Sequence, residues 1–127
     1  MPDSNQPCPE AEALEIPSYL AEMISDEAEA AAELIQMFLD DAASSLEKLD
    51  RALAENSPDR VTRLLHSMKG SCGQMGALKI SQLCAGLESG ALTGDLSGAR
   101  LRFPEMRSAF SEVRHLMEGL LPQPVKL

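Results

Sequence analysis

Hydrophobic side chains recur every three or four positions from about residue 17 to residue 121, and no segment alternates apolar and polar residues as a strand does. This spacing places the apolar side chains on one face of a helix. It predicts a short helix after Pro17 and then four longer helices. The apolar positions of the longer helices are Ile35, Phe38, Ala42, Leu46, Leu49 and Leu53; Val61, Leu64, Leu65, Met68, Cys72 and Met75; Ile80, Leu83, Cys84 and Leu87; and Ala99, Phe103, Met106, Phe110, Val113, Met117 and Leu120. We therefore expect an all-α fold, an antiparallel four-helix bundle with a short additional N-terminal helix.

Polar and helix-breaking residues indicate where these helices begin and end. Either Ser25 or Asp26 is expected to cap the first long helix, and Ser57 followed by Pro58 is typical of the start of the next one. Later breaks are predicted at Gly76, at one turn that Ser89-Gly90 and Thr93-Gly94-Asp95 form together, and at Gly119 and Pro122. Pro104 either kinks the last helix or belongs to the first turn of its regular part, and the sequence leaves both open.

The ends of the chain differ in composition from its centre. Residues 1–16 contain three prolines, several carboxylates and few large apolar side chains, so we expect a flexible acidic tail outside the core. The helical bundle is expected over residues 17–121, and a C-terminal tail over residues 122–127. A chain of 127 residues has the length of one domain.

Composition and charge exclude several classes of protein. The 20 Asp and Glu residues against 11 Lys and Arg give a net charge of −9, which argues against nucleic acid as a partner. No apolar run approaches the roughly 20 residues that span a bilayer, and no signal peptide is recognisable. We therefore expect a cytoplasmic protein with no membrane partner. The charge is unevenly distributed, because the helix after Pro58 carries Arg60, Arg63 and Lys69. We therefore expect this helix to tolerate a bound anion better than the acidic first half of the chain does.

One group of residues that could take part in a chemical reaction lies on that helix. At about 100° per residue, His66 lies about 140° from the apolar stripe that begins at Val61, so it faces solvent. Lys69 follows His66 by one turn, and Thr62 precedes His66 by one turn on the same face.

Two glycines lie on the same side of the helix. Gly70 and Gly73 lie about 180° and about 120° from Val61, and each costs roughly 1 kcal/mol relative to alanine in a helix interior. We expect both to clear side chains from the space around His66, so that the backbone of another protein can reach the imidazole. Close contact with a neighbouring helix is the other explanation for such a glycine.

An exposed imidazole with an ordinary pKa near 6.5 is largely neutral at cellular pH and is a nucleophile. His66 could attack phosphorus and hold a phosphoryl group as a phosphoramidate, while Lys69 offsets the charge of the phosphate oxygens. A P-loop is excluded because Lys69 precedes the glycines instead of following them. The cysteines and the second histidine, His115, show no metal-ligand spacing, so no metal site is expected.

The segment from His66 to Ala77, with His-x-x-Lys-Gly-Ser and a later Gly-Ala, resembles the signature of histidine-containing phosphotransfer (HPt) domains. Downstream, Leu83 to Glu88 is similar to the fourth-helix pattern of this family, and upstream the stretch from Met37 to Leu53 resembles its second helix. The resemblance covers about residues 18–120. It implies a monomeric helical bundle that carries a phosphoryl group between receiver domains and has no kinase or nucleotide site of its own.

The resemblance also implies roles for individual residues. His66 would be the phosphoacceptor, Lys69 would neutralise the phosphate, and Gly70 would give clearance to the incoming receiver. Gly73 and Thr62 are added to the docking surface by their positions on the helix. The aspartates and the Mg²⁺ that assist transfer would belong to response-regulator or hybrid-kinase receiver domains, so no cofactor is expected in this chain.

One position departs from the family pattern. Some members place a glutamine on the adjacent helix to hydrogen-bond the histidine, whereas the spacing here suggests Glu88, and Gln82 lies on another face. The residue that orients His66 is therefore left open. The alternative function is a docking module for a receiver domain or histidine kinase that works without phosphorylation. The presence of His66 with Lys69 three residues later favours transfer.

Overall fold

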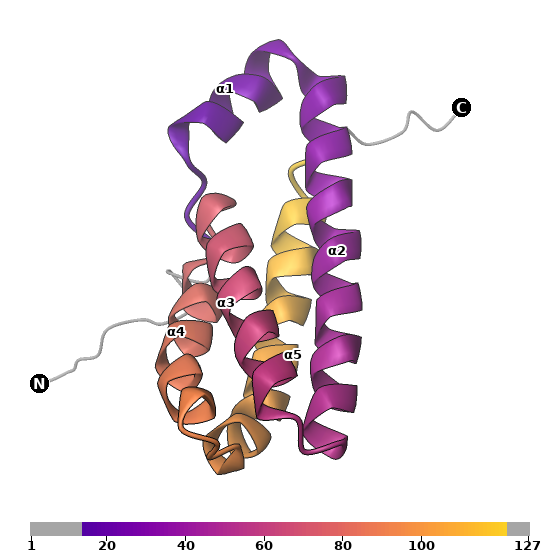
Figure 1. Ribbon diagram of the computed structural model, residues 1–127. Coiled ribbons are helices and arrows are strands. Elements are labelled where there is room, and N and C mark those ends of the chain that lie inside the picture. The colour runs from indigo at the N-terminus through magenta and orange to yellow at the C-terminus, as the bar shows by residue number, and fades with distance from the viewer. Residues whose placement is uncertain (1–13, 122–127) are drawn as a thin grey trace, which may run out of the picture.

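The computed structural model describes residues 14–121, which form five helices and no strand. The helices are α1 (Ser18–Asp26), α2 (Ala28–Ala54), α3 (Pro58–Gln74), α4 (Leu78–Leu92) and α5 (Ser97–Glu118). Figure 1 shows α2 to α5 running up and down in alternation, with α1 set at an angle across the end where α2 begins. The prediction of an all-α, antiparallel four-helix bundle with a short leading helix is confirmed.

The core is formed by the predicted apolar faces. Each of α2, α3, α4 and α5 packs against two of the others, which places α3 and α5 diagonally across the bundle. Nearly all predicted apolar positions are buried, and no polar or charged side chain of residues 14–121 is buried with them. Leu64, Leu83, Leu87 and Leu120 are half-buried. None of the described helices has both the length and the apolar character that a membrane crossing requires, and the cellular location stays a prediction.

The predicted cap of α2 is wrong. Ser25 and Asp26 belong to the last turn of α1, because the N–H of Glu27 still bonds to the carbonyl oxygen of Met23 at 2.6 Å. Glu27 is the residue before α2, and its side chain makes no cap bond. By contrast, Ser57 and Pro58 do mark the start of α3, although the Ser57 side chain makes no cap bond either.

Pro104 lies inside a continuous α5, two turns after the helix begins. It is therefore not in the first turn. A proline at such a position removes one backbone hydrogen bond, because it has no N–H to donate, and its ring crowds the carbonyl group four residues earlier.

The N-terminal boundary of the bundle differs from the prediction. Leu14 and Ile16 are half-buried against the core, and the N–H of Glu15 donates to the Gly76 carbonyl oxygen at 2.7 Å. Gly76 has φ of +84°, and a Cβ there would overlap the Glu15 carbonyl, so only glycine fits this crossing. The predicted tail is thus wrong for residues 14–16, while residues 1–13 and 122–127 lie outside the described part of the chain.

Candidate functional site

The outer face of α3 presents His66. Its side chain is 68 % exposed, whereas its neighbour Leu65 is fully buried. The 100° rotation between successive helical residues accounts for this contrast, since Leu65 belongs to the apolar stripe that packs into the bundle. The expected solvent exposure of the histidine is confirmed.

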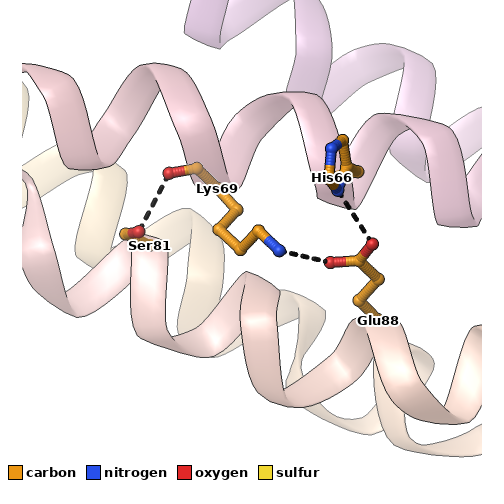
Figure 2. A network of polar contacts seen from close by, with 4 residues as sticks. All are labelled: His66, Lys69, Ser81 and Glu88. Carbon is orange, nitrogen blue, oxygen red and sulfur yellow. Dashed lines mark hydrogen bonds and ion pairs between the residues drawn. The ribbon is translucent and has the colours of Figure 1, made fainter.

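Glu88 of α4 connects the two chemically important side chains of α3. One of its carboxylate oxygens, Oε2, lies 3.0 Å from His66 Nδ1, and the other, Oε1, accepts a hydrogen bond from Lys69 Nζ at 3.0 Å. Figure 2 shows the carboxylate reaching from α4 to a point between the imidazole and the ammonium group. The side chain of Glu88 is only 16 % exposed, against 36 % for Lys69. The question of which residue contacts the imidazole is therefore answered by Glu88.

The charge on Glu88 determines which ring nitrogen of His66 is free. The hydrogen bond from Lys69 holds the pKa of Glu88 below its usual value; partial desolvation opposes this, and the hydrogen bond from His66 reinforces it. The carboxylate is thus ionised at neutral pH and can only accept hydrogen bonds. In the neutral imidazole Nδ1 must then carry the hydrogen, which leaves the lone pair on Nε2. The exposed ring therefore has its nucleophilic nitrogen at Nε2.

A second contact between α3 and α4 corrects the prediction for Gly73. Ser81 of α4 donates from Oγ to the Lys69 carbonyl oxygen at 2.9 Å (Figure 2), and a Cβ on Gly73 would lie 3.2 Å from the same Oγ. Gly73 thus faces α4 and allows the two helices to approach closely. The expectation that it clears the space around His66 is wrong. Ser81 was not predicted, because the sequence does not reveal which residue of α4 lies opposite Gly73.

Gly70 and Thr62 lie on either side of His66 along the helix. A Cβ at Gly70 would meet nothing within 4 Å, so this position is open as expected. Thr62 is half-buried in a groove of about 440 Å³ between the start of α3 and the end of α4, which Arg63 and Leu92 also line. Their roles in docking stay predictions.

The remaining candidate groups lie elsewhere. His115 is exposed on α5, which is diagonal to α3 in the bundle. Cys72 and Cys84 are buried, and desolvation raises the pKa of each thiol to about 12, so they are poor nucleophiles. Within residues 14–121, no group of three or more His, Cys, Asp or Glu side chains is placed to hold a metal ion.

Comparison with known proteins agrees with this geometry. The sequence model of the Hpt domain matches residues 33–121, which include all of α3, α4 and α5. The fold is similar to the crystal structure of histidine-containing phosphotransfer protein B (HptB) from Pseudomonas aeruginosa PAO1, with a TM-score of 0.78 and 28 % sequence identity over 86 % of this chain and 94 % of that one. The comparison with curated protein sequences gave no match. The chain belongs to the Hpt family of histidine-containing phosphotransfer domains.

Proposed function

We propose that this chain is a phosphoryl carrier of a two-component phosphorelay, in which His66 takes a phosphoryl group from the aspartate of one receiver domain and passes it to another. The observation that carries the proposal is the exposed imidazole with Nδ1 bonded to Glu88 and with Lys69 on the same carboxylate. Membership of the Hpt family supports it. The chain acts as a carrier, because transfer needs a nucleophile here but no nucleotide site.

The transfer step uses the lone pair of His66 Nε2. It attacks the phosphorus of the aspartyl phosphate; the N–P bond forms, the P–O bond breaks, and the aspartate leaves as a carboxylate with the bonding electrons. The hydrogen on Nδ1 remains, so the ring becomes a phosphorylated imidazolium next to the Glu88 carboxylate. The same step in reverse passes the phosphoryl group to a second receiver. Lys69 offsets the charge on the phosphoryl oxygens.

The partner approaches over the outer face of α3. The open position at Gly70 leaves room for the backbone of a receiver on one side of His66, and the groove at Thr62 lies one turn before His66 on the same helix. The Mg²⁺ that assists transfer is held by the receiver of the response regulator or hybrid kinase, so the chain requires no cofactor of its own. A monomer suffices, because the carrier residues come from one chain.

The test is phosphotransfer from a panel of receiver domains that a small phosphodonor has charged beforehand. Intact mass of the chain should show one acid-labile phosphoryl group in the wild type and none in His66→Gln. His115→Gln is the matched control, since it removes the other histidine from the diagonal helix, and it should be labelled like the wild type. Labelling of His66→Gln would overturn the assignment. Binding of a receiver without transfer would favour the docking module.

A further inference from the structure

The carboxylate of Glu88 is shared by two groups that the phosphoryl group also needs. We propose that Glu88 is a positioning residue which competes with the phosphoryl group for Lys69, so that its negative charge reduces what Lys69 contributes to holding the phosphoryl group on His66. This inference rests on the proposed function. It concerns the balance between loading and release, which that function leaves open.

Lys69 is paired with Glu88 before any transfer takes place. Lys69 Nζ lies 3.0 Å from Glu88 Oε1, and the Glu88 side chain is half-buried between α3 and α4. The ammonium group is thus already engaged before any phosphoryl group arrives. Figure 2 shows the Lys69 side chain extended toward the carboxylate of Glu88 on α4. A phosphoryl group on Nε2 of His66 would attract the same ammonium group, whose single positive charge would then be shared between two anionic groups.

Phosphorylation changes the charge of this cluster. When the imidazole is in its nucleophilic, neutral form, it lies beside one carboxylate and one ammonium group, and the cluster then has no net charge. Phosphorylation adds about two negative charges on the phosphoryl oxygens and leaves one positive charge on the ring. Glu88 attracts the ring and repels the phosphoryl group, and these two effects oppose each other. What remains is that two anionic groups now compete for one ammonium group.

A glutamine at position 88 would remove this competition. Its amide oxygen can still accept the hydrogen bond from Nδ1, but it carries no charge to hold Lys69. Lys69 would then be free to pair with the phosphoryl oxygens. The consequence is a specific dependence between the two residues: Lys69 should contribute more to phosphoryl retention when Glu88 is neutral than when it is charged.

A double-mutant cycle measures this dependence without a receiver domain. The full-length chain is incubated with phosphoimidazole and excess imidazole, so that one N–P bond breaks on the small molecule and one forms at His66. Intact mass gives the loaded fraction at equilibrium for the wild type, Lys69→Ala, Glu88→Gln and the double variant. The opposing effects of Glu88 on ring and phosphoryl group cancel in this comparison, because they are present with and without Lys69.

We expect Lys69→Ala to reduce loading by a factor about two to five times larger in the Glu88→Gln background than with Glu88 present, the size of an exposed ion pair. Equal factors in the two backgrounds, or a larger factor with Glu88 present, would overturn the inference. The ¹⁵N shifts of the His66 ring show whether Nδ1 keeps its hydrogen in each variant, which separates lost orientation from lost competition. Glu112→Gln on the diagonal helix α5 is the charge control and should load like the wild type.

The two proposals fail in different ways. If the wild type takes no phosphoryl group, or if His66→Gln takes as much, the proposed function fails together with the inference. If His66 is loaded but the cycle shows no competition, only the inference fails.

Discussion

The inner and outer faces of α3 have opposite properties. The inner face consists of Val61, Leu65, Met68 and Cys72, none of which is more than 3 % exposed. The outer face carries His66, whose side chain is 68 % exposed. The side chains of His66 and Lys69 both contact the carboxylate of Glu88 on α4. Burial of each large apolar side chain stabilises the fold by about 1.5–3 kcal/mol. The outer contacts, which water and salt screen, contribute far less to stability.

This difference shows how one helix separates stability from chemistry. Leu65 and His66 are adjacent in sequence, yet a rotation of about 100° places one in the core and the other at the site. A substitution on one face should therefore change one property and leave the other nearly intact. The following experiments test that separation, beginning with the largest expected effect.

Leu65→Ala should destabilise the protein by about 2–5 kcal/mol, because it removes a fully buried side chain and leaves a cavity in the core. His66→Gln, one residue away, should change the unfolding free energy by no more than about 0.5 kcal/mol. Urea unfolding followed by circular dichroism measures both. The separation of the two faces is contradicted if the histidine variant loses as much stability as the leucine variant.

The two buried thiols should be almost unreactive in the folded protein. Burial raises the pKa of Cys72 and Cys84 from 9.0 to about 12. At pH 8 this lowers the fraction of reactive thiolate about a thousandfold. We expect a Cys8→Ser variant to take up no iodoacetamide over an hour, as seen by intact mass, and to take up two equivalents in urea. Rapid labelling of the folded chain would show that the core around α3 and α4 opens more readily than its packing implies.

What the sequence predicts well is what a single helix determines by itself. The start of α3 at Ser57 and Pro58, its buried stripe and the exposure of His66 all depend on local signals and on helical period, and the structure confirms them. The resemblance to the Hpt family is confirmed by the family match, and the role that it implies for His66 stays a prediction.

What the sequence predicts poorly depends on segments that meet only in the folded chain. Gly73 was placed on the open surface because its own helix points it outward from the stripe, but Ser81 of α4 lies against it. Likewise, Gly76 requires its positive φ and lacks room for a Cβ because the backbone of Glu15 crosses it. The helical wheel gives directions about one axis only. It contains no information on the register between two helices.

The two glycines of α3 therefore differ in the response to alanine. Gly70→Ala should stabilise the protein by up to about 1 kcal/mol, because its Cβ meets nothing and the unfolded chain loses freedom. The stability change on Gly73→Ala should be about 1 kcal/mol less favourable than that on Gly70→Ala. The added Cβ would lie 3.2 Å from Ser81 Oγ, so the hydroxyl must shift and its bond to the Lys69 carbonyl oxygen is weakened.

The Ser81→Ala background is the control for this comparison. Without the hydroxyl, the atom nearest to the added methyl group is the Cβ at 3.9 Å, an ordinary contact. Gly73→Ala should then give nearly the same gain as Gly70→Ala. Thermal melts of the four variants measure the differences. If both glycines respond alike when Ser81 is present, the close approach of α3 and α4 is not what requires Gly73.

The smallest effect concerns the outer face, and acid should reveal it. Hydrogen bonding from Lys69, reinforced by His66 and opposed by partial desolvation, holds the pKa of Glu88 below its ordinary value of 4.5. The folded chain therefore binds fewer protons at this site than the unfolded chain does as the pH falls toward 4.5. The stability that ionised Glu88 contributes is complete above that value and is lost as the pH falls through the lower, folded-state value. The melting temperature of the wild type should accordingly fall more steeply between pH 5 and pH 3 than that of Glu88→Gln, which has no carboxyl group there to titrate. Parallel curves for the two proteins would mean that the contacts of Glu88 with Lys69 and His66 are too weak in solution to link the outer face of α3 to the stability of the bundle.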